Sequence, residues 1–98
     1  MNRRTKALQI PMKVKKIVYD RDKGKCIWCG KRGDPVVHFI AKSQGGLGIE
    51  ENIVCGCAYC HARYDQSDQR NAYRAIARDY LRSKYPDWDE EKLYYKKW

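Results

Sequence analysis

Two short segments, CIWC at residues 26–29 and CAYC at residues 57–60, decide how this chain of 98 residues can fold. Each segment places two thiols two residues apart, so that both can point at one cation, and four thiolates complete the tetrahedron that zinc prefers. So short a chain buries little apolar surface, and such chains often depend on a bound metal or on disulfides. The expected ligands of this structural zinc ion are Cys26, Cys29, Cys57 and Cys60.

Other assignments of these cysteines stay open. Iron can occupy the same cage of four thiolates. Cys55 can compete as a ligand, although its spacing to Cys60 is less usual and we expect it to be a free thiol. His61 can complete a site of three cysteines and one histidine, which would leave one cysteine idle. The four thiols can also be unrelated buried side chains.

Outward from the cysteines, the sequence predicts an α+β fold. β-branched and aromatic residues at 36–41 and a shorter apolar run at 53–55 favour strands, and the glycine-rich stretch 44–48 between them requires a loop. A helix is expected to begin near Ala58. We expect flanking helices over residues 11–24, over 71–84 with Tyr73, Ile76, Ala77, Tyr80 and Leu81 buried, and after Pro86, where Asp87 or Asp89 caps a helix ending at Trp98.

Positive charge is concentrated at the beginning of the chain. Of the net charge of +9, residues 1–25 contribute +7, residues 26–66 contribute nothing, and residues 67–98 contribute +2. A basic arm on a neutral centre suits a polyanionic partner, most often the phosphate backbone of a nucleic acid. The alternative is that the lysines only keep a small protein soluble.

The sequence contains no apolar run that could span a bilayer and no recognisable secretory signal. We therefore expect a cytoplasmic protein that does not bind membranes. In that reducing compartment, paired cysteines usually bind metal and do not form disulfides.

A second constellation lies between the two cysteine pairs. The chain has HFIAKSQGG at residues 38–46, then Glu51 and Asn52, and then CAYCH at residues 57–61. This succession, over about residues 13–66, resembles the HNH endonuclease family, and also the short nucleases encoded in phage genomes. The resemblance implies a ββα-metal fold with a motif core at 26–66, C-terminal helices at 67–98, and a single nuclease domain over 11–98 preceded by a flexible basic arm at 1–10.

The resemblance also implies a role for three residues. His38 matches the general base, Asn52 matches the residue that ties the loop and fixes the base, and His61 matches a ligand of a catalytic divalent metal, Mg²⁺ or Mn²⁺. The implied activity is hydrolysis of phosphodiester bonds in double-stranded DNA, by a monomer or weak dimer, in one reading beside a phage terminase or other packaging proteins. The chemistry needs these groups, because a cation stabilises charge on the phosphate and imidazole can accept a proton near neutral pH.

The sequence departs from the family at one position. The residue before the base is usually Asp or His and helps to hold the metal, but here it is Val37, which cannot ligate. Asp65 lies one helical turn after His61, so its carboxylate could share the same ion. The other outcomes are a metal held partly by His38 and a site that has lost activity.

Basic residues outside this constellation are candidates for DNA contacts. Arginines recur every four residues at 70, 74, 78 and 82, a row that can follow a phosphate backbone or can pair with Asp68 and Asp79. The residues that we expect to contact DNA are Lys13, Lys15, Lys16, Lys42, Arg70 and Arg74.

Each of these residues can also have a purely structural role. His38 can be a packed core residue, Asn52 an ordinary turn residue, and Asp65 a surface partner of Arg63 or Arg70. The rival function is a zinc-ribbon module that binds DNA or protein, in phage packaging for example, without cutting. The three residues His38, Asn52 and His61 favour the nuclease, and Val37 favours the rival.

Overall fold

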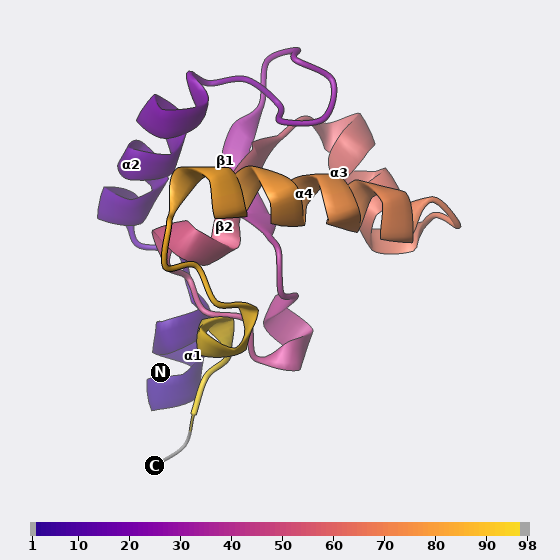
Figure 1. The fold of residues 1–98 in the computed structure, drawn as a ribbon. Coiled ribbons are helices and arrows are strands. Elements are labelled where there is room, and N and C mark those ends of the chain that lie inside the picture. The colour runs from indigo at the N-terminus through magenta and orange to yellow at the C-terminus, as the bar shows by residue number, and fades with distance from the viewer. Residues whose placement is uncertain (1, 97–98) are drawn as a thin grey trace.

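The computed structural model describes residues 2–96, which form a two-stranded sheet surrounded by helices (Figure 1). No helix in this range is both long and apolar enough to cross a membrane. The elements in chain order are α1 (Arg3–Leu8), α2 (Met12–Asp22), β1 (Asp34–His38), β2 (Ile53–Gly56), α3 (Ala58–Gln66) and α4 (Arg70–Lys84), with single 3₁₀ turns at Lys42–Gln44, Glu50–Asn52 and Glu90–Leu93.

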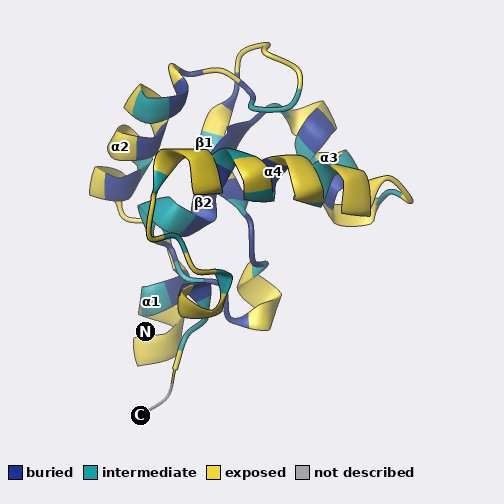
Figure 2. Cartoon of the chain, in the orientation of Figure 1, coloured by how far each residue is buried: buried dark blue, intermediate teal, exposed yellow. Residues whose placement is uncertain are grey.

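The sheet separates two apolar clusters. β1 and β2 are antiparallel, with Val37 opposite Val54 and His38 opposite Ile53. Because side chains alternate along a strand, Val37 and Val54 pack in the cluster that includes Tyr64 of α3 and residues of α4, whereas Ile53 and Cys55 pack against α2. Figure 2 shows the partly exposed β1 and the buried β2 behind α4, whose outer face is exposed.

Most of the predicted elements are found where the sequence places them. Helix α2 begins directly after Pro11, and the C-cap residue Lys23 and the following Gly24 both have positive φ, which ends the helix at Asp22. The helices at 58–66 and 70–84 agree with the predictions to within a residue or two. The small α+β architecture with flanking helices is therefore confirmed.

Four expectations need correction. The expected loose arm at 1–10 is wrong for residues 2–10, the part that the structure describes, because α1 forms there and Leu8 is buried with 3% exposure. The first strand ends at His38 and not at Ala41, because the side chain of Asn52 takes the hydrogen bonds of Ile40. The other two corrections concern the C-terminal region.

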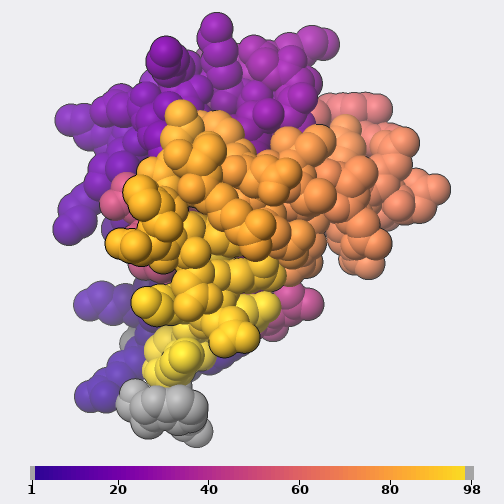
Figure 3. Space-filling model, viewed as in Figure 1, coloured from indigo at the N-terminus to yellow at the C-terminus, as the bar shows by residue number. Residues whose placement is uncertain are grey.

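In α4, Ile76 is half exposed and Ala77 and Leu81 form the fully buried stripe, because these two side chains face the sheet. After Pro86, Asp89 caps only a 3₁₀ turn over Glu90–Leu93 in place of a full helix, and Trp98 lies outside the described residues. In Figure 3, α4 and this C-terminal segment, in orange and yellow, cover the centre of the visible face.

A loop of residues 45–48, here called the glycine loop, is held from both sides. The Leu47 amide donates to the Leu93 carbonyl at 2.8 Å, and the Gly48 amide donates to the Ala7 carbonyl at 3.0 Å. The Tyr95 amide also donates to the Gly45 carbonyl at 2.8 Å. Segments from the beginning and the end of the described chain thus meet at one loop.

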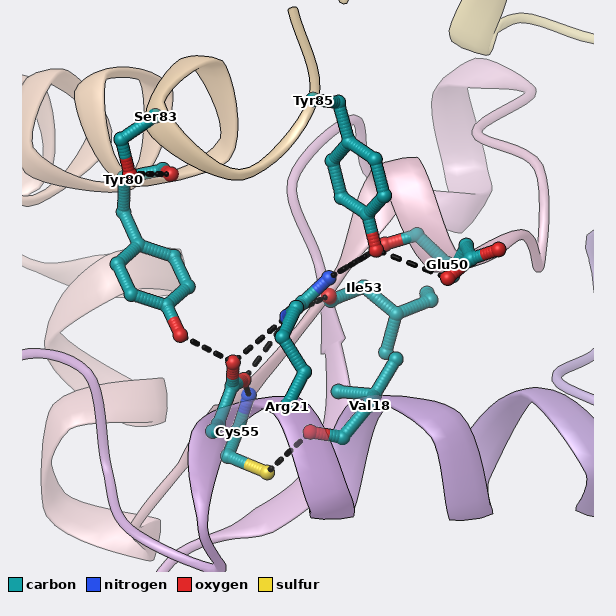
Figure 4. A network of polar contacts seen from close by, with 9 residues as sticks. Val18, Arg21, Glu50, Ile53, Cys55, Tyr80, Ser83 and Tyr85 are labelled. Carbon is teal, nitrogen blue, oxygen red and sulfur yellow. Dashed lines mark hydrogen bonds and ion pairs between the residues drawn. The ribbon is translucent and has the colours of Figure 1, made fainter.

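A buried ion pair joins α2 to the sheet and to α4 (Figure 4). The Arg21 guanidinium donates to the Asp22 carboxylate at 2.7 Å and to the Ile53 carbonyl at 2.7 Å. Tyr80 donates to the same carboxylate, which also accepts the Cys55 amide at 2.9 Å. Burial opposes the charge on Arg21, but its contacts with Asp22 raise the pKa of the guanidinium above its usual value. Arg21 therefore serves the fold, although in the sequence it counts only as part of a basic segment.

Candidate functional site: a thiol cluster and a histidine cleft

Four cysteines, here called the thiol cluster, come together from two turns of the chain. Cys26 and Cys29 lie in the turn before β1, where the Gly30 amide donates to the Cys26 carbonyl at 2.9 Å. Cys57 caps the N-terminus of α3, its sulfur accepting the Cys60 amide at 3.4 Å. The tight turn and the first helical turn therefore present their thiols to one point.

The geometry of the thiol cluster fits one metal ion. The four sulfurs lie within 4.8 Å of one another, and the sulfurs of Cys29 and Cys57 are 3.7 Å apart. A tetrahedral zinc ion with bonds of about 2.3 Å would place its sulfurs about 3.8 Å apart. Burial opposes ionisation of Cys26, but backbone amides including those of Cys57 and Cys29 lower the pKa of this thiol to about 7. The four cysteines are therefore positioned to bind a structural metal such as zinc.

The other two candidates for this site point elsewhere. Cys55 lies on the face of β2 that packs against α2, where its thiol contacts the Val18 carbonyl. Burial there raises the pKa of this thiol to about 12. The Nε2 atom of His61 lies 3.3 Å from the Asp65 carboxylate. Among the described residues, the four cysteines are the one cluster in which three or more potential metal ligands lie close enough together to share an ion. The structure thus favours a site of four cysteines over one of three cysteines and a histidine.

Both histidines line a single cleft, here called the histidine cleft. His38 enters it from the end of β1, and His61 and Asp65 enter it from α3. Asp65 is the only carboxylate among the lining residues that the structure describes. The basic residues that line the cleft are Lys15, Lys42, Arg70 and Arg74, four of the six predicted DNA contacts, whereas Lys13 and Lys16 lie outside it.

A main-chain contact orients the ring of His38. Its Nε2 lies 2.9 Å from the carbonyl oxygen of Leu8, which can only accept a hydrogen bond. In the neutral ring the proton therefore sits on Nε2, and Nδ1 keeps its lone pair. Burial lowers the pKa of His38, electrostatic interactions with Lys42 and His61 lower it further, and the Leu8 carbonyl acts in the opposite direction. The ring is thus held neutral and able to accept a proton.

Asn52 ties together the loop that follows β1. Its side-chain oxygen accepts the Ile40 amide at 2.8 Å, and its side-chain nitrogen donates to the carbonyls of Ile40 at 3.2 Å and Leu47 at 2.8 Å. The side chain is fully buried and each of its polar atoms is satisfied. Asn52 is therefore more than an ordinary turn residue, because it fixes the backbone two residues beyond His38.

His61 and Asp65 are the two groups in the cleft that could hold a catalytic divalent ion. They lie four residues apart on α3, with Nε2 and Oδ2 separated by 3.3 Å. Two neighbouring ligands of an octahedral ion with bonds of about 2.1 Å lie about 3.0 Å apart, so the pair fits two positions of one ion. Val37 offers no further ligand, because its side chain is fully buried in the core. A metal bound here would have most of its coordination positions open to other ligands.

The row of arginines on α4 divides into two halves. Arg70 and Arg74 face the histidine cleft, whereas Arg78 forms an ion pair with Glu90 at 2.9 Å and Arg82 lies over the ring of Trp88. The expected pairing with Asp68 and Asp79 is not among the ion pairs of the described residues. Only the first half of the row is thus available to a ligand in the cleft.

Sequence reasoning missed the contribution of the N-terminal segment. Gln9 and Ile10 line the cleft, and Leu8 supplies the carbonyl that contacts His38. The signal in the sequence was the apolar pair Leu8 and Ile10 directly before Pro11, which indicates a packed segment more than a free arm. Comparisons of the chain with protein-family models, with curated proteins and with solved structures give no match in any of the three.

Proposed function

We propose that this protein is a metal-dependent endonuclease of the HNH type that hydrolyses phosphodiester bonds of double-stranded DNA. The observation that carries the proposal is the arrangement of the histidine cleft. A neutral His38 with a free Nδ1 shares a basic cleft with the pair His61 and Asp65. The order of the two strands, the intervening loop and α3 is consistent with a ββα-metal core.

His38 acts as the general base. Nδ1 accepts a proton from a water molecule, and the oxygen of that water forms a bond to phosphorus while the bond to the 3′ oxygen breaks. The departing oxygen takes a proton from solvent, so the products are a 5′ phosphate and a 3′ hydroxyl. The proton on Nε2 stays hydrogen-bonded to the Leu8 carbonyl throughout, so the ring does not turn during the reaction.

The other residues of the cleft bind and orient the substrate. Lys15, Lys42, Arg70 and Arg74 offer positive charge to phosphates on either side of the bond that is cut. His61 and Asp65 would hold Mg²⁺ or Mn²⁺, which supplies stabilisation of the charge on the phosphate and on the departing oxygen. The thiol cluster binds zinc and takes no part in the chemistry, since four thiolates leave no open position.

The proposal is tested with supercoiled plasmid and zinc-loaded protein. We expect nicked circles in Mg²⁺ or Mn²⁺ and none when EDTA is added. His38→Ala should slow nicking by about 10²- to 10⁴-fold, the usual contribution of a general base. Zinc content and melting temperature serve as controls that the variant is folded. A wild type that nicks no faster than His38→Ala would contradict the proposal.

A second candidate is a zinc-stapled module that binds DNA without cutting it. Val37 favours this candidate, because only two ligands for a catalytic ion remain. The two functions separate in one experiment, in which salt-dependent binding to duplex DNA is measured beside nicking. Binding without any metal-dependent nicking would favour the module.

A further inference from the structure

We propose that the N-terminal helix α1 is a positioning element for His38, with the Leu8 carbonyl holding the ring so that Nδ1 is the atom that accepts the proton. This inference rests on the proposed function and deepens it. It concerns a segment that lies outside the stretch on which the family resemblance depends. Leu8 is a positioning residue, since its carbonyl acts through His38.

The contact between Leu8 and His38 joins two distant parts of the sequence. The carbonyl oxygen and Nε2 are 2.9 Å apart, across 30 residues of chain. Within the part of the chain that the structure describes, the His38 ring makes one hydrogen bond, and it is this one. When Nδ1 takes a proton the ring becomes a cation, and the bond from Nε2 to the carbonyl becomes charge-assisted and stronger. Leu8 therefore stabilises the state that the base reaches during the reaction.

The Leu8 carbonyl is placed by contacts on each side of it in the sequence. Before it, the Ala7 carbonyl accepts the Gly48 amide at 3.0 Å. After it, Ile10 packs against the buried cluster between α2 and the sheet. The Leu8 side chain itself is buried with 3% exposure. These three contacts leave the carbonyl little freedom to move away from His38.

The glycine loop is shaped to accept this segment. A Cβ atom at Gly48 would lie 1.8 Å from the Gln9 carbonyl oxygen and 2.5 Å from the Gln9 carbonyl carbon. Both atoms belong to backbone, so no side-chain rotation could relieve the clash. Only glycine at position 48 lets α1 approach closely enough for Leu8 to reach His38. Gln9 and Ile10 then form part of the cleft wall.

The direct test weakens the carbonyl and changes no side chain at Leu8. The chain can be assembled by ligation at the junction between Lys25 and Cys26, with residues 1–25 made by synthesis. Lactic acid in place of residue 9 turns the Leu8 carbonyl into an ester carbonyl, a poorer acceptor, and Gln9→Ala is its amide counterpart. The ester also removes the Gln9 amide that donates to the Thr5 carbonyl at 3.2 Å. The matched control therefore places lactic acid at position 7, which removes one amide of α1 and weakens the Lys6 carbonyl, while the Ala7 and Leu8 carbonyls stay amides.

The first readout is the protonation of the two ring nitrogens, measured by ¹⁵N NMR. The chain has two histidines, so the His38 signals are assigned by comparison with a His61→Gln variant. We expect wild type, Gln9→Ala and the control ester to carry the proton on Nε2. In the ester of Leu8 the Nε2 signal should lose its hydrogen-bonded shift. An unchanged Nε2 signal, or a wild type with the proton on Nδ1, would overturn the inference.

The second readout is plasmid nicking by the same four proteins. The Leu8 ester should nick about tenfold more slowly than Gln9→Ala, the loss expected when one hydrogen bond is weakened as charge develops. The control ester should match wild type. Equal rates for the Leu8 ester and Gln9→Ala would overturn the positioning role. If wild type does not nick DNA at all, the proposed function fails, and the NMR experiment still decides whether Leu8 fixes the ring.

Gly48→Ala gives an independent test in a recombinant protein. The added methyl group should separate the glycine loop from Gln9 and move Leu8 away from His38. We expect the His38 signals to shift as they do in the Leu8 ester and nicking to fall at least tenfold, while the thiol cluster, whose first two cysteines precede β1 rather than follow it, keeps its zinc. A variant with unchanged His38 signals and unchanged nicking would count against the inference.

Discussion

The thiol cluster and the histidine cleft share helix α3 but differ in how completely each can surround an ion. Cys57 and Cys60 direct their sulfurs to the cluster, and His61, the next residue, faces the cleft with Asp65. The cluster offers four protein ligands at tetrahedral spacing, whereas the cleft offers two ligands and four positive side chains. A site whose protein ligands fill the coordination sphere can only stabilise the fold, and a site that leaves positions open can act on a ligand.

The largest effect that separates the two regions is expected from Cys57→Ser. The serine oxygen can still cap α3 but is a poor zinc ligand, so the variant isolates the loss of the metal. Structural zinc contributes about 10 kcal/mol or more in small domains, as much as the whole stability of a typical domain. We expect loss of the cooperative thermal transition and of the bound zinc, measured by calorimetry and by native mass spectrometry.

Cys55→Ala is the matched control, because Cys55 is buried like Cys26 and Cys60 but faces α2. It should retain one zinc per chain and a cooperative transition. A Cys57→Ser protein that melts like wild type would show that the thiol cluster does not staple the fold.

Asn52→Ala tests whether the histidine cleft depends on the hydrogen bonds that the Asn52 side chain makes to the loop after β1. The change leaves the Ile40 amide and the carbonyls of Ile40 and Leu47 without their partners. We expect a loss of about 3 kcal/mol in the free energy of unfolding, from buried groups left unsatisfied, and a fall in melting temperature of about 15 °C. Zinc content should not change. The exposed Asn71, replaced by alanine, should leave the melting temperature within a few degrees of wild type.

Asp65→Asn sharpens the distinction between the two metals. The variant removes one negative ligand from the cleft and leaves the thiol cluster intact. The Mg²⁺ concentration needed for half-maximal nicking should rise about tenfold, as expected when one of two protein ligands loses its charge. Asp68→Asn, an exposed neighbour outside the cleft, is the control. An equal Mg²⁺ requirement in wild type and Asp65→Asn would remove Asp65 from the metal site.

The dependence of nicking on pH should report His38 and not the thiols. A protonated His38 cannot accept a proton, so the rate falls as the pH drops through the pKa of this residue. Burial, together with Lys42 and His61, lowers that pKa below its ordinary value of 6.5, so the plateau of activity should extend below pH 6.5. Lys42→Gln should move the midpoint to higher pH. A midpoint above 6.5 in wild type would contradict the assignment of His38 as a buried neutral base.

The smallest effect is expected from Lys15→Gln, compared with Lys13→Gln. Lys15 lines the cleft and Lys13 does not, although both belong to α2. Loss of one phosphate contact should reduce the slope of log affinity against log salt by about 0.9. We expect this reduction in Lys15→Gln and a smaller one in Lys13→Gln, measured by fluorescence anisotropy with duplex DNA. Equal slopes for the two variants would mean that the cleft does not bind the backbone.

The features that could be predicted from sequence are those that depend on local spacing. The thiol cluster follows from two cysteine pairs, and α2 ends where Gly24 allows a positive φ. The pairing of His61 with Asp65 follows from their separation by one helical turn. Within each cysteine pair, at the end of α2 and within α3, the residues that decide the local geometry are a few positions apart.

The features that could not be predicted depend on partners far away in the chain. Leu8 is held because Gly48 has no side chain; the apolar pair Leu8 and Ile10 indicates a packed segment but does not identify this distant partner. Arg21 lies in a segment whose composition is typical of a solvated basic surface. Its charge is nevertheless neutralised by Asp22, and its guanidinium donates hydrogen bonds to the Ile53 carbonyl of β2 and to Tyr85. The first strand ends early because Asn52, fourteen positions after His38, takes the hydrogen bonds of Ile40.

The attachment of the glycine loop to Ala7 on one edge and to Leu93 on the other has a kinetic consequence. Contacts between residues so far apart in sequence close large loops of chain, and such contacts generally form late in folding. The metal-bound centre of the molecule can therefore assemble first, with the wall beside His38 completed only when both outer segments arrive. The amide protons of Leu47 and Gly48, although they belong to a loop, should then exchange with solvent as slowly as those of the outer segments that cover them.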